Sequence, residues 1–334
     1  MKIVVTGARG FVGTALVTAA ARTGHAGVAT GRTAPVGLPP TWRGVGRDEL
    51  LGRSVDGHRA EAVIHLEVHQ HAGTTTVDEL EELDHVNVAG TVAWLDWATR
   101  QRIDRFVLAS SVLAVTRSAG ATDELAPPET VSPYGASKAR AEIAVRRWAS
   151  ESPSRRAVIL RLAPVYGPDR RSNLIHFVTR VAAGRIALIG TGAARKSIVS
   201  RDNAAAALLH AATSAPPGVT VFNVADREAH SVRELAVAVA RLTGAPPPRS
   251  VPLALARMAA PLADACGAML GRDLPLSSAR LRAATAPGYF PCDRLLASGF
   301  VHPQSTEAGL EAMIRGLGIA SRSGGTREPG DVGE

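Results

Sequence analysis

The chain has 334 residues, 46% of them hydrophobic, which suits one large α/β domain or a large and a small one. Its net charge is +8, but the arginines are scattered and no basic run is interleaved with aromatic residues, so nucleic-acid binding is not expected. Cys266 and Cys292 lie too far apart for a metal-ligand motif and predict a reduced, cytoplasmic protein without disulfides. Because the chain opens directly on an apolar strand, no signal peptide is expected.

The first thirteen residues read M-K-I-V-V-T-G-A-R-G-F-V-G and predict a strand, a glycine turn and a helix. Residues 3–5 are β-branched and apolar, as in a parallel strand covered on both faces, and residues 11–23 have helical spacing. One glycine allows the tight turn, the next lets a pyrophosphate approach the backbone, and the third lets the helix pack closely. The start of the helix offers N–H groups to the phosphates. The predicted dinucleotide contacts here are Gly7, Arg9, Gly10, Phe11, Val12 and Gly13.

The second strand is expected at residues 27–30, and the residues at its end bear on the choice of cofactor. Chains that bind NAD usually place Asp or Glu there to hold the ribose 2′-hydroxyl, whereas this chain continues Gly31-Arg32-Thr33. Arg32, and Arg9 from the glycine turn, can pair with a 2′-phosphate, although solvated surface arginines would look the same. The pattern favours NADP, with NAD as the alternative.

An apolar strand at residues 62–66 is followed by three titratable side chains, Glu67, His69 and His71. Without further ligands at helical or hairpin spacing no metal site is predicted there, and a substrate contact or a solvated loop is the better interpretation. Residues 78–100 have the apolar spacing of one long helix. Asn87 lies among its apolar positions, so it should point toward the sheet and need a polar partner.

The strand at residues 105–109 ends in Ser110 and Ser111, at the carboxyl end where parallel sheets bind ligands. A helix at residues 132–150 follows, and Tyr134 and Lys138 lie four residues apart on one of its faces. An ammonium group one turn away should lower the pKa of the phenol from its ordinary value of about 10 and provide a proton relay at neutral pH. A nearby serine hydroxyl can hold the substrate oxygen while hydride moves.

The last third of the chain continues the alternation of helices and strands. Residues 251–270 are the most apolar long run, but Arg257, Pro261 and Asp264 interrupt it, so an amphipathic helix is predicted and not a membrane span. Strands are expected at residues 187–189 and 219–224, and helices near residues 174–183, 201–213, 232–243 and 304–317.

Together these motifs resemble the extended short-chain dehydrogenase/reductases, in the NAD(P)-dependent epimerase/dehydratase group that acts on nucleotide sugars. The resemblance runs from residue 1 to Leu317 in the family's order. It rests on T-G-A-R-G-F-V-G from Thr6, His65-Leu66, N-V-A-G-T from Asn87, Ser110-Ser111, Y-G-A-S-K from Tyr134, R-L-A-P-V-Y-G-P from Arg161, R-K-S-I-V-S-R-D-N from Arg195, and V-F-N-V from Val221.

The resemblance implies an α/β fold, a doubly wound parallel sheet (Rossmann) with a smaller, discontinuous C-terminal substrate-binding region. Residues 1–168, rejoined by residues 197–228, would form the dinucleotide-binding domain. Residues 169–196 and 229–319 would form the substrate-binding region, and residues 320–334 a disordered tail. The helices near residues 78–100 and 132–150 pair two subunits in many relatives, which implies a homodimer.

The resemblance also implies roles for single residues. Tyr134 would be the catalytic acid/base, Lys138 its electrostatic helper and a ribose contact, and Ser111 the hydroxyl partner, with Ser110 as the fallback. Further cofactor contacts would be Leu66, Asn87, Ser110, Pro164 and Val165. Substrate contacts would be Glu67, Ser111, Asn173, Arg195, Arg280 and Arg282, since fork-like guanidinium groups suit a diphosphate. Glu67 stands where the family usually has alanine.

The sequence therefore predicts an NADP-preferring enzyme that reduces a keto group, at C4 of a nucleotide-linked sugar. The preference for net reduction rests on NADP, because cells keep that pool reduced. The alternatives are a 4-epimerase with tightly bound NAD, a reductase of a carrier-free ketone or alcohol, and a non-catalytic NADP-binding sensor. Dehydration is set aside, because the acidic residues that the family's dehydratases carry beside the serine are absent. The expected partner is a small-molecule substrate, and binding to nucleic acid or to a membrane is not expected.

Overall fold

The computed structural model describes residues 1–52, 60–70, 76–130, 132–214, 216–270 and 277–319. The chain divides into two units: unit 1 comprises residues 1–165, 197–229 and 288–306, and unit 2 comprises residues 166–196, 230–287 and 307–334. The sequence-based division assigned residues 288–306 to the substrate-binding region, but Phe290, Leu295 and Phe300 are buried in the core of unit 1. The predicted disordered tail, residues 320–334, lies outside the described residues.

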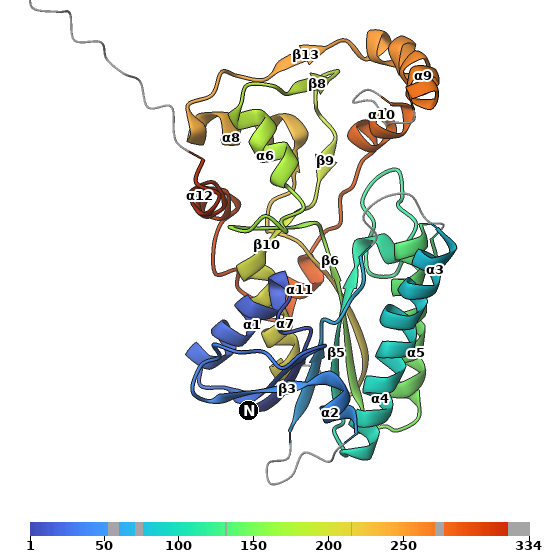
Figure 1. The fold of residues 1–334 in the computed structure, drawn as a ribbon, viewed down its shortest axis with the longest axis vertical. Helices are drawn as coiled ribbons and strands as arrows, with labels where there is room; N and C mark the ends of the chain where they lie inside the picture. The colour runs from blue at the N-terminus through green and yellow to red at the C-terminus, as the bar shows by residue number, and fades with distance from the viewer. Residues whose placement is uncertain (53–59, 71–75, 131, 215, 271–276, 320–334) are drawn as a thin grey trace, which may run out of the picture. The chain divides into compact units, whose positions relative to one another are not determined.

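A seven-stranded parallel sheet forms the centre of unit 1 (Figure 1). Its spatial order is β11-β6-β5-β4-β1-β2-β3, and every pairing in it is parallel. The direction of winding reverses between β1 and β4, which is where such sheets bind ligands. The doubly wound fold is confirmed. The strands are β1 (Lys2–Thr6), β2 (Ala26–Gly31), β3 (Trp42–Gly46), β4 (Ala62–His65), β5 (Arg105–Ser111), β6 (Arg156–Leu162) and β11 (Gly218–Val224).

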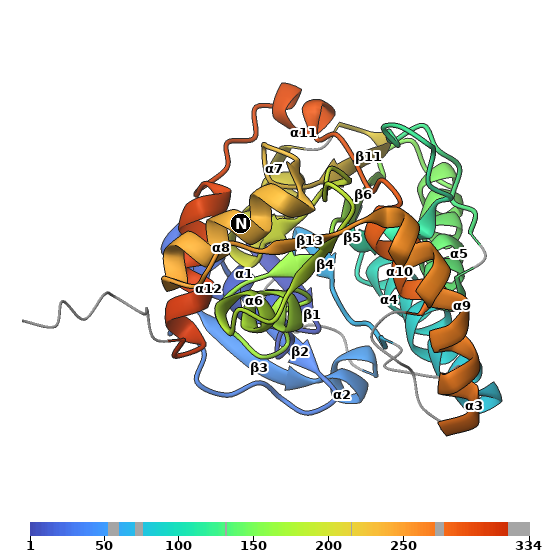
Figure 2. The ribbon, with the colours of Figure 1, turned by 90° about the horizontal axis from the view of Figure 1, so that it is seen from above.

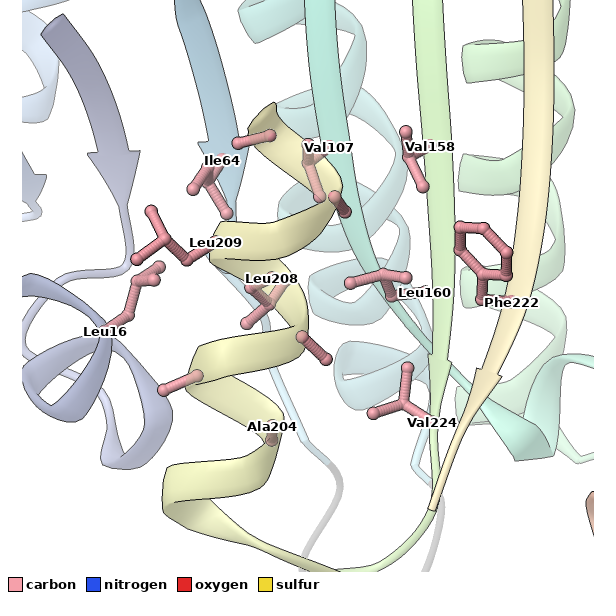
Figure 3. Packing of buried hydrophobic residues seen from close by; sticks show 14 of the residues in the cluster. Leu16, Ile64, Val107, Val158, Leu160, Ala204, Leu208, Leu209, Phe222 and Val224 are labelled. Atoms are coloured by element: carbon pink, nitrogen blue, oxygen red, sulfur yellow. The ribbon is translucent and has the colours of Figure 1, made fainter. Parts of the chain in front are cut away.

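Helices cover both faces of this sheet, because alternate residues of each strand point to opposite sides. Ile3 of β1 belongs to one buried cluster together with Leu208 of α7 (Arg201–Ser214), whereas its neighbour Val4 belongs to a second cluster with Trp94 of α4 (Gly90–Arg100). Figure 3 shows Leu208 of α7 directed toward the strands that carry Val107 and Leu160. The helices of unit 1 are α1 (Phe11–Arg22), α2 (Arg47–Leu51), α3 (Val77–Leu83), α4 (Gly90–Arg100), η2 (Val112–Ala114), α5 (Pro133–Ser150), α7 (Arg201–Ser214) and α11 (Asp293–Ala297).

The helix predicted at residues 78–100 is present, as a continuous helical run over residues 77–100 whose middle turn is π-helical. Helix α3 begins with a capping box between Thr76 and Glu79, and α4 begins at Gly90. Between them lies η1 (Asp84–Ala89), a π-helical turn that contains Asn87. Such turns put an extra residue into a helix and are frequent at functional sites. The spacing of apolar residues did not reveal this turn.

Unit 2 is built of short strand pairs and helices. β8 (Ala187–Ile189) pairs with β13 (Arg249–Val251) in parallel, and β9 (Arg195–Lys196) pairs with β12 (His230–Ser231) in antiparallel. Its helices are α6 (Ile175–Ala182), α8 (Val232–Thr243), α9 (Leu253–Leu270), α10 (Ser278–Thr285) and most of α12 (Thr306–Gly316). Two further strands have two residues each: β10 (Val199–Ser200) belongs to unit 1, and β7 (Val165–Tyr166) lies where the chain passes from unit 1 to unit 2. Within the described part of the chain no helix combines the length and apolarity needed to cross a membrane.

Candidate active site

The glycine turn joins the end of β1 to the start of α1. Gly7 has a φ of 64°, in the left-handed region, and a Cβ atom there would lie 2.7 Å from the carbonyl carbon of Leu66, just after β4. A Cβ atom at Gly13 would lie 2.4 Å from the carbonyl oxygen of Gly7, so α1 packs on the turn itself. Gly10 precedes α1 and supplies no side-chain cap. The turn therefore leaves room at a helix N-terminus, which fits a pyrophosphate.

Arg9 lies across the end of β2. A Cβ atom at Gly31, the last residue of β2, would lie 3.8 Å from Cγ and Cδ of the Arg9 side chain. The Arg9 guanidinium donates a hydrogen bond to the hydroxyl of Thr33. Arg32 is exposed. The end of β2, where dinucleotide-binding folds hold the adenosine ribose, thus carries a cation and no carboxylate.

A chain of buried hydrogen bonds crosses the carboxyl end of the sheet through His65. Its Nδ1 lies 2.7 Å from Thr6 Oγ1, and its Nε2 lies 3.2 Å from Thr91 Oγ1. Because Thr91 Oγ1 already donates to the carbonyl of Asn87 at 2.7 Å, it must accept from Nε2, which assigns the neutral Nε2–H tautomer. Burial, helped by two nearby cations, keeps the pKa of His65 well below 6.5. His65 is therefore a neutral group that ties β4 to β1 and α4.

Asn87 fastens the loop after β4. Its Oδ1 accepts from the N–H of His69 at 2.8 Å, and its Nδ2 donates to the carbonyl of His69 at 3.0 Å and to Ser137 Oγ at 2.9 Å. Ser137 in turn donates to the carbonyl oxygen of Tyr134 at 2.8 Å. Asn87, expected at the cofactor, uses its amide to join this loop to Ser137 of α5. His71 lies outside the described residues.

Ser110 and Ser111, at the end of β5, have different partners. Ser110 Oγ donates to Glu142 Oε1 at 2.6 Å. Glu142 also forms an ion pair with Arg161, at 2.8 Å between Oε2 and Nη2, and neither side chain has exposed surface. Ser111 Oγ accepts from the N–H of Leu113 at 3.1 Å, and the Ser111 side chain lies close enough to the phenol of Tyr134 to lower its pKa. Ser111, and not Ser110, is thus the hydroxyl beside the phenol.

Tyr134 and Lys138 lie in the first turns of α5. Burial raises the pKa of Tyr134 above its ordinary value of 10.0, although hydrogen bonds with the side chains of Gln70 and Ser111 oppose this shift. The sequence-based expectation of a lowered pKa is therefore wrong for this site, because it counted the neighbouring ammonium and not the burial of the phenol. Burial also lowers the pKa of Lys138 to about 8, against the attraction of Glu142.

Two side chains of the loop after β4 differ from expectation. Gln70 contacts the phenol, and no pattern in the sequence pointed to it, because its position depends on the hydrogen bonds that fasten the loop. Glu67 was expected at the substrate. Its Oε1 accepts from Arg47 Nη1 at 3.1 Å and its Oε2 from Trp94 Nε1 at 3.1 Å. Both oxygens are used within unit 1, which favours a role for Glu67 in fixing α2 and α4.

The remaining predicted contacts lie in both units. In unit 1 the carbonyl of Pro164 accepts from the N–H of Val199 at 3.1 Å, and Val165 is buried. Unit 2 holds the expected substrate residues: Asn173 before α6, Arg195 in β9 and Arg282 in α10 are exposed, and the side chain of Arg280 lies outside the described residues. Among the residues that the structure describes, no group of three or more His, Cys, Asp or Glu is arranged to hold a metal ion.

The fold and the site define an enzyme of the extended short-chain dehydrogenase/reductase type: a doubly wound sheet carries a glycine turn at its switch point and a Ser–Tyr–Lys set two strands away. Residues 3–225 match the sequence model of the NAD dependent epimerase/dehydratase family. The chain belongs to this family.

Known relatives act on different substrates. The chain is 24% identical over 232 residues, 69% of its own length and 70% of the relative's, to N-acetyl-alpha-D-glucosaminyl-diphospho-ditrans,octacis-undecaprenol 4-epimerase of Escherichia coli O157:H7. It is 28% identical over 256 residues, 74% of its length and 77% of the relative's, to 2-alkyl-3-oxoalkanoate reductase of Stenotrophomonas maltophilia (strain K279a). The solved structure of MoeE5 in complex with UDP-glucose and NAD has the same fold, with a TM-score of 0.70, 22% identity, and coverage of 95% of this chain and 98% of that one.

The lowered pKa of Lys138 can be measured directly. The chain has three lysines, Lys2, Lys138 and Lys196, so NMR of isotopically labelled lysine side chains gives few signals, and Lys138→Met assigns the one of interest. We expect Lys138 to lose its proton near pH 8, because burial disfavours the ammonium. A midpoint above about 10 would contradict the buried position of Lys138.

The ion pair beneath Tyr134 and Lys138 leads to a second prediction. Glu142→Gln leaves the Arg161 guanidinium buried without its counter-charge, so the free energy of unfolding should fall by about 3 kcal/mol. The matched control is Glu151→Gln, since Glu151 pairs with Arg155 at 2.6 Å but is 54% exposed and should contribute less than about 1 kcal/mol. Urea unfolding of both variants measures the difference in stability. Equal losses of unfolding free energy would show that the buried pair does not stabilise the fold more than the exposed pair.

Proposed function

We propose that the chain interconverts two epimers at C4 of a sugar carried on a diphosphate, by hydride transfer to and from a nicotinamide cofactor. The observation that carries this proposal is the meeting of Ser111 and Tyr134 at the end of β5, with Lys138 buried one turn further along α5. A hydroxyl, a phenol and an ammonium are the groups needed to move a proton at an alcohol carbon while hydride leaves or arrives.

The glycine turn fits the cofactor that this chemistry requires. A bound nicotinamide supplies the hydride and takes it back. Gly7, Gly10 and Gly13, with the N-terminus of α1, would hold its pyrophosphate, since a side chain at Gly7 or Gly13 would collide with backbone. Arg9 would lie at the adenosine ribose, at the end of β2.

Tyr134 acts as the acid when a carbonyl is reduced. Its raised pKa keeps the phenol protonated at neutral pH, so it has a proton to give to the oxygen that Ser111 holds. Lys138, with a pKa of about 8, is mainly charged at neutral pH and stabilises the phenolate left behind. In the oxidising direction the phenolate takes the hydroxyl proton back. An epimerase needs both directions at one carbon.

The charge of unit 2 supports a diphosphate carrier. Unit 2 contains 16 Lys and Arg against nine Asp and Glu, whereas unit 1 contains 22 against 21. The exposed Arg195 and Arg282 in unit 2 offer the forked donors that suit a diphosphate. The carrier is a nucleotide, as in the UDP-glucose bound by MoeE5, or a lipid, as in the substrate named for the E. coli relative.

Replacing Tyr134 tests the reaction. Tyr134→Phe should lower turnover of nucleotide- and lipid-linked sugar diphosphates by about 10²–10⁴-fold, because the proton relay is lost. Binding of the cofactor, followed by nicotinamide fluorescence, should persist, because the glycine turn is untouched. Tyr289→Phe removes a phenolic hydroxyl elsewhere in unit 1 and is the matched control. Unchanged turnover in Tyr134→Phe would exclude the proposed role of the phenol.

Net reduction with NADPH is the second candidate, and the position of Arg9 favours it. Its guanidinium lies at the end of β2 with the Thr33 hydroxyl, a combination that suits a 2′-phosphate. An enzyme of this kind exchanges its cofactor at every turnover and consumes NADPH. Its substrate would be a keto-sugar on a diphosphate, or a carrier-free ketone.

Titration of the purified protein with NADPH, NADH, NADP and NAD separates the two candidates. If the second candidate is correct, NADPH binds more tightly than the other three nucleotides but still exchanges readily. Arg9→Ala then weakens NADPH binding by about 10- to 100-fold, the contribution of a charge-assisted hydrogen bond to affinity, and leaves NADH binding unchanged. Arg22→Ala, at the other end of α1, is the control for net charge. NAD that co-purifies and stays bound would reject net reduction and support the epimerase.

A further inference from the structure

Most of the large apolar side chains of helix α9 are exposed, whereas the residues that it buries are small. Ala256 and Ala260 are buried beside Leu281 of α10, and the figures show α9 and α10 packed together (Figures 1 and 2). Its large side chains point the other way and are mostly exposed: Leu255 56%, Met258 76%, Leu262 68%, Met269 88% and Leu270 59%. A helix that serves only to pack on its own protein has the opposite pattern, so this face needs another explanation.

The exposed side chains form one continuous stripe. Positions 255, 258, 262, 266 and 269 are three or four residues apart and so share one face of the helix, which we call the α9 stripe. Its members are Leu255, Met258, Leu262, Cys266 and Met269. The stripe runs for about 20 Å along the helix. The two charged residues of α9, Arg257 and Asp264, lie on the side nearer the buried alanines.

The net charge of unit 2 indicates which kind of surface the α9 stripe binds. Unit 2 has a net charge of +7, from 16 basic and nine acidic residues, against +1 for unit 1, from 22 and 21. Almost all the excess positive charge of the chain therefore lies in the unit that carries the stripe. An apolar helix face on a strongly basic unit is complementary to a surface that is apolar beneath and anionic outside.

We propose that the α9 stripe docks unit 2 on an anionic phospholipid bilayer. A helix lying flat can insert such a stripe among the acyl chains while the basic unit is attracted to the headgroups. A second copy of the chain suits the stripe less well, because it would bring two units of charge +7 together. This proposal replaces the expectation of no membrane partner. It does not rest on the proposed reaction and can fail independently of it.

Co-sedimentation of the full chain with vesicles tests the proposal. We expect binding to vesicles of phosphatidylcholine and phosphatidylglycerol, weaker binding to phosphatidylcholine alone, and loss of the difference at high salt. The triple variant Leu255→Gln/Met258→Gln/Leu262→Gln should bind at least about a hundredfold more weakly, because each side chain loses an apolar contact with the acyl chains. The matched control is Val36→Gln/Leu125→Gln/Val301→Gln, three apolar side chains of unit 1 that are 91%, 82% and 79% exposed.

Cys266 provides a second readout, because it is exposed within the stripe. Cys292, the other cysteine, is buried, and burial raises the pKa of its thiol to about 11, so a thiol-directed fluorophore labels Cys266 selectively. Transfer of the label into acyl chains should shift its emission to the blue. Equal binding by the two triple variants, or no binding to anionic vesicles, would overturn the proposal. A wild-type dimer that the stripe variant dissociates, without vesicle binding, would assign the stripe to self-association.

Discussion

The buried ion pair between Glu142 and Arg161 is the constraint on which the catalytic end of unit 1 depends. It joins α5 to β6, the hydroxyl of Ser110 adds β5, and Arg161 also reaches the carbonyl of Ala126 at 2.9 Å in the segment before α5. Separating such a pair leaves an uncompensated charge in the interior, so the ion pair fixes the position of α5 on the sheet. Helix α5 carries both the phenol of Tyr134 and the ammonium of Lys138. Their position relative to the strand ends therefore follows from the position of the helix.

Two of the cations near the carboxyl end of the sheet are each paired with a carboxylate, and a third is not. Arg47 is neutralised by Glu67, and Arg161 by Glu142, whereas Lys138 is buried with only a longer-range attraction to Glu142. The neutral tautomer of His65 fits this arrangement, because a further buried cation would raise the electrostatic cost of the site. The hydrogen-bond chain through His65 thus gives rigidity without adding charge.

The sequence predicted the parts of this structure that depend on neighbours along the chain. The glycine turn and the Tyr134–Lys138 spacing are local, and the structure has them where they were expected. The pairs Glu67–Arg47 and Glu142–Arg161 join residues 20 and 19 positions apart, which no periodicity reveals. The predicted direction of the Tyr134 pKa shift was wrong because the shift depends on burial, which is a property of the assembled fold and not of the neighbours along the chain. The strand β3 was not predicted because two of its five residues, in W-R-G-V-G, are glycines, which are depleted in strands.

The shifts of Tyr134 and Lys138 share one cause, because burial favours the neutral form of both groups. In the resting site the phenol is neutral and the ammonium is a buried cation whose acidic neighbour, Glu142, is already paired with Arg161. A negative charge on the phenol would lie one helical turn from this cation, which would lower the cost of forming the phenolate. The buried phenol and the ammonium therefore form a pair that can release and recover one proton at the end of the sheet.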